Sequence, residues 1–289
     1  MFKQKYWVLF LDFALLLLVS IALVLVEFGT IPHLQSIGFF CGDPKINYKY
    51  KGDTVESHVL VLVTLIVPYI TAIMTEYFTK DTNKFDSGRY EWLKESLKWY
   101  RKFILGVIFV FFITNVGKML IGEPRPHFLD TCHPEEAKNC TNKYIDQYTC
   151  TNKKENTYNV RDASKSFPSG HASISVYGSI SLAWYLQDKC KSRSMLLMPV
   201  LQAICIFWAM FCSLTRITDH RHHWWDVLAG SIIGIVISTY INGLFDKQKT
   251  DNKSHSTTET WSNETTDNGY LTGRLLNVVT DGKNPTLNL

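Results

Sequence analysis

Long apolar segments alternate with charged and polar segments along most of this 289-residue chain. Six apolar windows are long enough, or nearly so, to cross about 30 Å of hydrocarbon as helices that rise about 1.5 Å per residue. They cover roughly residues 6–28, 57–77, 103–121, 172–187, 195–214 and 227–245. The pattern predicts an all-α fold, a six-transmembrane helical bundle within residues 1–245. The mean hydropathy of the whole chain does not show this pattern, because polar loops and a polar tail offset the apolar windows.

Two of the six windows differ from an ordinary membrane span. The window at 172–187 is the shortest and least apolar, and it is rich in small side chains. Because small residues allow close helix packing, we expect this helix to lie inside the bundle rather than against lipid. The window at 6–28 could be a signal peptide, but it is long and lacks a small-residue cleavage site, which favours an uncleaved signal anchor.

The distribution of basic residues orients the predicted bundle. Lysine and arginine are concentrated between the second and third windows and between the fourth and fifth. These residues are Lys80, Lys84, Arg89, Lys94, Lys98, Arg101, Lys102, Lys189, Lys191 and Arg193. Basic loops stay in the cytosol, so both termini are predicted to be cytosolic and the loops at 29–56, 122–171 and 215–226 extracellular or luminal. We place the protein in the plasma membrane, although these residues do not distinguish it from an internal membrane.

The cysteines fit the same orientation. The predicted outer loops contain Cys41, Cys132, Cys140 and Cys150, whereas Cys190, Cys205 and Cys212 fall in a cytosolic loop or a span. Four cysteines in an oxidising compartment allow two disulfides, with three pairings. Asn139-Cys-Thr is a glycosylation sequon whose use we leave open, because a disulfide at Cys140 could restrict access to it.

Beyond residue 245 the chain becomes a mixture of Lys, Asp, Asn, Ser and Thr with few large apolar residues. This composition predicts a disordered cytosolic tail over 246–289, in which the sequons at Asn252 and Asn263 stay unmodified. The last residues, 286–289, match weakly what a PDZ-type partner binds, namely alternate apolar side chains and a free carboxylate. The small net charge is spread over both sides of the membrane, and we expect no nucleic-acid partner. The sequence leaves a homo-oligomer open.

Three short motifs, each beside a predicted helix end on the outer side, carry the candidate chemistry. They are Lys118-Met-Leu-Ile-Gly-Glu-Pro-Arg-Pro126, Pro168-Ser-Gly-His171 and Thr215-Arg-Ile-Thr-Asp-His-Arg-His-His-Trp-Trp-Asp226. Lys118, Arg125 and Arg216 supply three cations that can neutralise a phosphate, and two flanking prolines stiffen the backbone at Arg125. Alternatively, these cations are interfacial anchors, which is the commoner use of basic residues at span ends.

The second motif precedes a predicted helix. Free backbone N–H groups and the helix dipole favour an anion there, and Gly170 lets the backbone approach a phosphate closely. Ser169 is equally well explained as a helix cap. His171 adds a side chain that exchanges a proton near neutral pH.

The third motif contains a histidine and an aspartate four residues apart. On the opening turn of a helix, Asp226 can bond one ring nitrogen of His222 and leave the other as a nucleophile. His223 would point about 100° away from His222 and pack with Trp224 and Trp225. The local excess of histidine raises the alternative of a metal site, but HExxH and CxxC spacings are absent, and we expect no metal and no other cofactor.

These motifs resemble those of the type 2 phosphatidic acid phosphatases, or lipid phosphate phosphatases, whose pattern is K-x6-R-P, P-S-G-H and S-R-x5-H-x3-D. Thr215 stands in place of the serine and keeps its hydroxyl. Runs at 39–43, 125–132 and 139–145 look like the animal members, and the resemblance covers residues 1–245 but not the tail.

The resemblance implies a six-helix membrane enzyme with a type 2 phosphatidic acid phosphatase/haloperoxidase-like core that needs no metal. Its implied substrates are phosphatidate, lysophosphatidate, sphingosine 1-phosphate or ceramide 1-phosphate. His222 would form a phosphohistidine, Asp226 would steady the charged ring, and His171 would protonate the leaving alcohol.

Two other functions share this scaffold. A non-enzymatic lipid-phosphate binder or adhesion protein would be expected to lack the nucleophile, whereas His222 fills that position. A related enzyme could act on soluble phosphates or a polyisoprenyl diphosphate, but the six spans and the animal-type runs argue against it.

Overall fold

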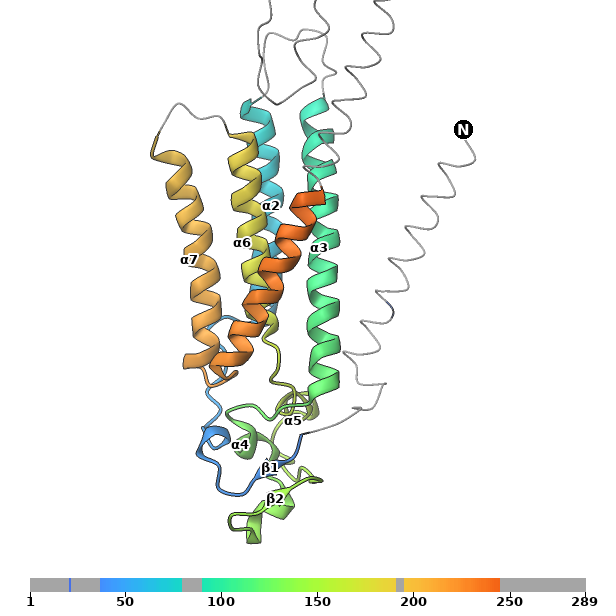
Figure 1. Cartoon of the computed structure of the whole chain (residues 1–289), viewed down its shortest axis with the longest axis vertical. Helices are drawn as coiled ribbons and strands as arrows, with labels where there is room; N and C mark the ends of the chain where they lie inside the picture. Colours follow the sequence, from blue (N-terminus) through green and yellow to red (C-terminus); the bar gives the residue numbers. More distant parts are fainter. Residues whose placement is uncertain (1–20, 22–36, 80–89, 191–194, 245–289) are drawn as a thin grey trace, which may run out of the picture. The chain divides into compact units, whose positions relative to one another are not determined.

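The computed structural model describes residues 21, 37–79, 90–190 and 195–244, which are mostly helical (Figure 1). The long helices of these residues are α2 (Ser57–Thr79), α3 (Glu91–Ile121), α6 (Gly170–Lys189), α7 (Leu197–Thr218) and a last helix, Trp224–Leu244. Four helices of the described chain, all of these except α6, are long and apolar enough to cross a membrane. The protein is therefore membrane-embedded, as predicted.

Several predictions lie outside the described residues. They concern the first span at 6–28 apart from Ile21, the side chain of Asn139, and the tail at 246–289 with its sequons and C-terminal residues. Six spans therefore stay a prediction.

The start of α3 differs from the predicted third span. The helix begins at Glu91, twelve residues before the apolar window at 103–121. Its first turns carry charged side chains, among which Lys98 Nζ lies 3.8 Å from Glu95 Oε1. Glu, Lys and Leu favour helix irrespective of polarity, so the end of an apolar window does not mark the end of a helix.

Helix α6 is packed among other helices, which confirms the interior position predicted for it. It contacts α2, α3 and α7, and its small residues other than Gly170 and Ala183 are buried. The hydroxyls of Ser173 and Ser175 donate to the carbonyl oxygens of Ser169 and His171, at 2.8 and 2.7 Å. These bonds within the helix satisfy hydroxyls that would otherwise be costly to bury.

The last helix crosses α6 closely because it presents glycine to the α6 backbone. A Cβ atom at Gly234 would lie 2.6 Å from the carbonyl oxygen of Ser173 and 3.0 Å from the backbone nitrogen of Tyr177. One helical turn further along, the hydroxyls of Ser181 and Ser238 are 3.0 Å apart. Glycine thus permits the contact that brings the beginnings of the two helices together.

The segments between the long helices form short elements. They are β1 (Phe39–Phe40), η1 (Pro44–Ile46), α4 (Phe128–Cys132), η2 (Glu135–Asn139), β2 (Tyr144–Ile145) and α5 (Thr157–Asp162). The strands pair antiparallel, with Phe39 opposite Ile145 and Phe40 opposite Tyr144. The all-α prediction was wrong on this point, because two-residue strands are too short to show an alternating pattern.

Two disulfides cross-link these segments. Cys41 is joined to Cys140 and Cys132 to Cys150, with Cα atoms 5.8 and 4.7 Å apart. The sequence left three pairings open, because pairing depends on which loops meet in space. The remaining cysteines, Cys190, Cys205 and Cys212, are free thiols.

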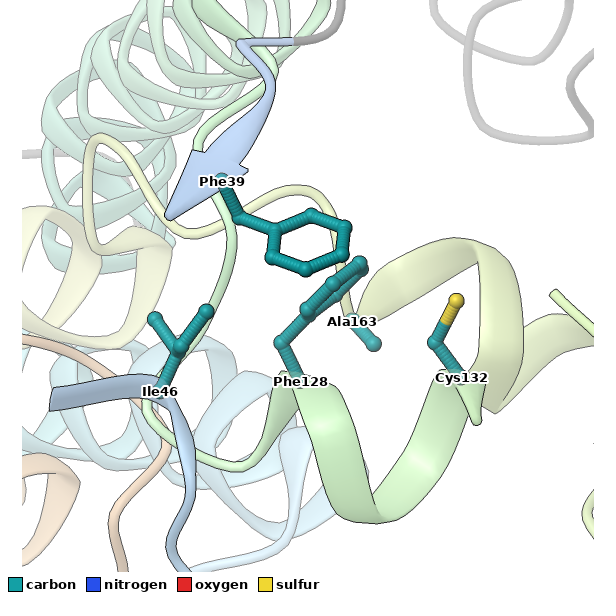
Figure 2. Close-up of a cluster of buried hydrophobic side chains, with 5 residues drawn as sticks. All are labelled: Phe39, Ile46, Phe128, Cys132 and Ala163. Atoms are coloured by element: carbon teal, nitrogen blue, oxygen red, sulfur yellow. The ribbon is translucent and has the colours of Figure 1, made fainter. Parts of the chain in front are cut away.

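A small hydrophobic cluster holds the same segments together (Figure 2). It consists of Phe39, Ile46, Phe128, Cys132 and Ala163, all buried. The rings of Phe39 and Phe128 have centroids 5.4 Å apart, a tilted arrangement typical of stable aromatic pairs. Beside the cluster, the backbone N–H of Arg125 donates to the carbonyl oxygen of Ala163 at 2.8 Å. The cluster thereby fixes the backbone that carries Arg125.

The close crossing of α6 and the last helix at Gly234 can be tested by comparing the stability of two variants. Alanine is the better helix former by about 1 kcal/mol, but at Gly234 its methyl group would overlap the α6 backbone, and overpacking costs about 1–3 kcal/mol. Among the described residues, no atom outside the helix itself lies within 4 Å of a Cβ built at Gly243, so Gly243→Ala is the matched control. In detergent-solubilised protein, Gly234→Ala should lower the melting temperature and Gly243→Ala should not. Equal melting temperatures would contradict the close crossing.

Candidate active site

The structure brings the residues of the three sequence motifs to adjoining helix ends. Lys118 is in the last turn of α3, which ends at Gly122 in a left-handed conformation with φ 59°. Arg125 follows in the next segment, Ser169 is the N-cap of α6, and Gly170 and His171 begin that helix. Arg216 lies in the last turn of α7, and Asp226 in the first turn of the last helix. A Cβ at Gly170 would be 3.8 Å from Lys118 Nζ, so α3 and α6 meet at this point.

The carboxylate of Asp226 is fully buried and is held by several donors. Its Oδ2 atom accepts from the hydroxyl of Ser166 at 2.5 Å and from the backbone N–H of His223 at 2.9 Å. The second contact is a helix-capping bond, because Asp226 lies three residues after the N-terminal cap. The Asp226 carbonyl oxygen also accepts from the backbone N–H of Ser169 at 3.0 Å. Asp226 therefore joins the start of α6 to the start of the last helix.

His222 lies beside Asp226, but not on a helix as the sequence suggested. The last helix begins at Trp224, so His222 belongs to the preceding turn, which its backbone N–H closes by donating to the Arg216 carbonyl oxygen at 3.1 Å. Its Nδ1 atom is 3.6 Å from Asp226 Oδ2, longer than a hydrogen bond. Catalytic pairs are often loose without substrate, and a small ring movement would complete the bond. The opposite nitrogen, Nε2, is then the candidate nucleophile.

The position of the His223 ring differs in part from the one predicted from the sequence. Its ring stacks on Trp225 with centroids 4.4 Å apart, which confirms the packing predicted with this one of the two tryptophans. The expectation that it turns away from Asp226 was wrong, because His223 Nδ1 is 3.4 Å from Asp226 Oδ2. The same nitrogen is 3.8 Å from Oε1 of Glu123, which also accepts from Trp225 Nε1 at 2.9 Å. The expected separation assumed one continuous helix, whereas the chain bends at these residues.

Arg216 is buried and bound by acidic side chains. It donates to Asp53 Oδ1 at 2.7 Å and to Asp219 Oδ2 at 3.1 Å. Asp219 also accepts from the backbone N–H and hydroxyl of Thr54, at 2.8 and 2.6 Å. These contacts offset the cost of burying a guanidinium and fix its plane. The hydroxyl of Thr215 bonds the Cys212 carbonyl oxygen at 3.0 Å, as a serine hydroxyl also could.

Arg125 is held in the same way from the other side. It donates to Asp162 Oδ1 at 2.8 Å. Asp162 also lies 3.3 Å from a second arginine, Arg221, whose Nε atom is 3.0 Å from Asp53. Arg221 thus links the carboxylates that bind Arg125 and Arg216. Within the described part of the chain, the buried Nε atoms of Arg125 and Arg216 have no hydrogen-bond partner, so each arginine keeps a donor for another anion.

His171 is attached to the segment before α2. Its Nε2 atom is 3.1 Å from the carbonyl oxygen of Val55, which also accepts from Arg216 at 3.0 Å. A carbonyl oxygen only accepts, so Nε2 carries the proton and Nδ1 is the basic nitrogen in the neutral ring. His171 and Arg216 are consequently oriented by one backbone group.

Two groups outside the membrane-spanning helices have strongly shifted pKa values. Burial lowers the pKa of His222 to about 3, although Asp226 opposes this shift, and Arg125 and Lys118 reinforce it. His222 is therefore neutral at physiological pH, as a nucleophile must be. Burial alone would raise the pKa of Asp162, but Arg125 and the other cations hold it at about 2.

A groove opens between α6, α7 and the last helix, close to the site in sequence and space. Its volume is about 830 Å³. Its walls are mostly apolar and include Ile180, Trp184, Met210 and Leu214, and Trp224 and Leu228 line it two residues beyond His222 and Asp226. All of these residues belong to membrane helices or to α6, so the groove is suited to a hydrocarbon chain.

Sequence reasoning missed part of this site. Asp53, Asp162 and Ser166 bind the predicted residues Arg216, Arg125 and Asp226. Glu123 lies beside His223, and Arg221 binds Asp53 and Asp162. None of these five residues was selected from the sequence. Glu123 lies inside the first motif and Arg221 inside the third, so their charge was a usable signal. Asp53 and Asp162 come from polar loops, where a single aspartate carries no pattern.

The chain was compared with known proteins. Residues 99–249 match the PAP2 superfamily, a range that contains all three motifs. Mouse (Mus musculus) phospholipid phosphatase 1 is 33% identical over 236 residues, which are 76% of this chain and 82% of the mouse protein. Phospholipid phosphatase 2 of cattle (Bos taurus) is 29% identical over 84% of this chain and 85% of its own length.

A Drosophila melanogaster relative, provisionally named a phosphatidate phosphatase, is 32% identical over 74% of this chain. The chain spans 63% of the length of that protein. No solved structure matches the chain significantly. The family match and the mammalian relatives show that the chain belongs to the PAP2 superfamily and, within it, to the lipid phosphate phosphatases of animal type.

Proposed function

We propose that this protein hydrolyses lipid phosphates through a phosphohistidine on His222, without a metal ion. The observation that carries the proposal is a buried, neutral imidazole beside the Asp226 carboxylate, in the electrostatic field of Arg125 and Lys118. A neutral nucleophile close to fixed cations suits phosphoryl transfer, in which most catalysis is positioning and charge stabilisation.

In the first step, Nε2 of His222 attacks phosphorus and the bond from phosphorus to the lipid oxygen breaks. Lys118, Arg125 and Arg216, with Ser169 and the Gly170 amide, stabilise the charge on the other phosphate oxygens. His171 acts in its protonated form and gives the Nδ1 proton to the leaving oxygen, and the free lipid alcohol departs. Asp226 stabilises the positive charge that develops on the His222 ring.

In the second step, water attacks the phosphohistidine. His171, which lost its proton in the first step, accepts one from the water. The phosphorus–nitrogen bond breaks, and inorganic phosphate and the original imidazole are released. The cations take the place that metal ions hold in other phosphatases, so the cycle needs none.

The acidic partners of the arginines prepare the site rather than block it. Asp53 and Asp162 each leave the Nε atom of their arginine without a hydrogen bond among the described residues. A phosphate can therefore bind these donors while the carboxylates keep each guanidinium in place. Such preorganisation avoids reorganisation at the moment of reaction.

The substrate is proposed to be a membrane lipid with a terminal phosphate. The apolar groove next to Trp224 and Leu228 offers room for an acyl chain, and the relatives are named for phospholipids and phosphatidate. Phosphatidate, lysophosphatidate, sphingosine 1-phosphate and ceramide 1-phosphate share this chemistry, and we propose them as candidates. The site would face the extracellular side of the plasma membrane or, for an internal membrane, the lumen, where Cys41–Cys140 and Cys132–Cys150 are expected to form.

The proposed sidedness is tested by epitope accessibility in intact cells. A C-terminal tag should react with antibody only after permeabilisation, whereas a tag near Glu136 should react from outside or, for an internal membrane, from the lumen. The basic segments and the disulfides motivate this result. The reverse pattern would place the site in the cytosol.

A metal-free mechanism predicts resistance to chelators. Phosphate release from phosphatidate in detergent micelles should continue in excess EDTA and stop with vanadate, whose five-coordinate form mimics the transferring phosphoryl group. Activity that disappears with EDTA and returns with magnesium would favour metal-assisted hydrolysis instead. A protein that binds the lipid and releases no phosphate would support the non-enzymatic alternative.

Substrates with different leaving groups distinguish the roles of the two proposed catalytic histidines. His222→Asn should abolish both turnover and the phosphoenzyme. His171→Asn should lose most activity on lipid substrates, but an aryl phosphate with an acidic phenol needs little protonation and should still phosphorylate His222. The second step then lacks its base, so phosphoenzyme should accumulate.

His220→Asn is the control for these variants, because His220 lies in the same turn and stacks on Tyr48 with centroids 4.2 Å apart. It should retain activity and form no unusual intermediate. Phosphohistidine trapped at a residue other than His222, or equal losses on both substrates in His171→Asn, would contradict the assigned roles.

A further inference from the structure

Glu123, His223 and Asp226 form a compact group that the proposed catalytic cycle does not use as a whole. His223 Nδ1 lies 3.8 Å from Glu123 Oε1 and 3.4 Å from Asp226 Oδ2. One ligand atom from each residue falls within 4.8 Å of the other two. The group joins the end of α3 to the start of the last helix, which are about a hundred residues apart in the chain.

The surroundings of this group make it unusual. The exposed fractions of the three side chains are 21%, 9% and 0% in sequence order. Among the described residues, His223 Nδ1 and Asp226 Oδ1 are buried without a hydrogen-bond partner. The imidazole nitrogen thus lies between two carboxylates and is bonded to neither. Burial and the nearby Asp226 charge raise the pKa of Glu123 to about 7, which shows that the two carboxylates repel each other.

We propose that Glu123, His223 and Asp226 bind one divalent cation, with zinc as the preferred ion. Zinc takes imidazole nitrogen and carboxylate oxygen at about 2.0–2.2 Å, and neighbouring ligands of a tetrahedral site are about 3.4 Å apart. Two of the observed separations, 3.4 and 3.8 Å, are already close to that value, and all three ligand atoms lie within 4.8 Å of one another. Two carboxylates and a neutral imidazole also match the charge of the ion, and a fourth position stays open to water.

The ion would regulate the reaction rather than take part in it. Asp226 Oδ2, the atom nearest His223, is also the atom 3.6 Å from His222 Nδ1. A cation on this oxygen withdraws its charge from the nucleophile and repels the imidazolium that forms during transfer. Zinc should therefore inhibit an enzyme whose chemistry needs no metal, a consequence that rests on the proposed function.

Binding can be measured without reference to catalysis. The full-length protein in detergent is stripped with chelator, desalted and titrated with zinc alone by calorimetry, with metal content checked by mass spectrometry. About one zinc per chain should bind to the wild type. Glu123→Gln and His223→Asn should each weaken binding at least about tenfold, since even outer-shell changes at metal sites cost this much. Glu123→Asp should restore part of the affinity because it restores the carboxylate.

Two controls complete the binding test. His220→Asn removes a histidine of the same turn that is not part of the group, and it should bind zinc like the wild type. His222→Asn should also bind zinc while forming no phosphoenzyme, so a failure of the proposed function would not be mistaken for a failure of the metal site. Unchanged zinc affinity in folded Glu123→Gln, judged by its melting temperature, would overturn the site.

Inhibition provides the second readout. Zinc should lower phosphate release by the wild type and by His220→Asn at the same concentration. Relative to its own metal-free activity, Glu123→Gln should need at least about tenfold more zinc. Equal inhibition of Glu123→Gln and wild type would show that zinc acts elsewhere, for example on the lipid phosphate, and would overturn the regulatory role.

Discussion

The buried carboxylate of Asp226 is the interaction on which the rest of the site depends. Its side chain is contacted by Ser166 and His223 and lies beside His222, while its backbone oxygen binds Ser169. A buried carboxylate is tolerated only when donors or cations surround it. That requirement draws the loop before α6, the start of α6 and the start of the last helix into one place. The residue proposed to orient the nucleophile thus also positions the helix that carries His171.

Charge balance organises the remaining cations in a similar way. Arg125, Arg216 and Arg221 would repel one another, but Asp53 and Asp162 each bind two of them. The buried arginines are thereby held in a fixed arrangement of alternating charge, which isolated guanidinium groups could not keep. The side chain of Arg221 binds both Asp53 and Asp162 and so connects the two carboxylates. The proposed binding of phosphate would depend on this acidic scaffold as much as on the arginines.

The sequence predicted the parts of the structure that follow from local patterns. Apolar windows located four membrane helices, small residues indicated the interior position of α6, and motif spacing selected residues that lie together. Features that depend on distant segments could not be found in this way. The β1–β2 pairing, the partners of each cysteine, and the contacts of Asp53 and Asp162 arise only when loops meet. One continuous helix was assumed from the sequence, and the bend before Trp224 was therefore not predicted. This bend brings His223 close to Asp226.

Helix packing and site chemistry are linked through α6. The close approach of Gly234 to the backbone at Ser173 and Tyr177 is possible only without a side chain. The same crossing sets how far the start of α6 lies from the start of the last helix, and so fixes the bond between Ser169 and Asp226. A displacement of about 1 Å at the crossing would be transmitted along a stiff helix to Gly170 and His171, and errors of that size reduce catalysis severely. The glycine at this crossing therefore serves the geometry of the proposed phosphate site.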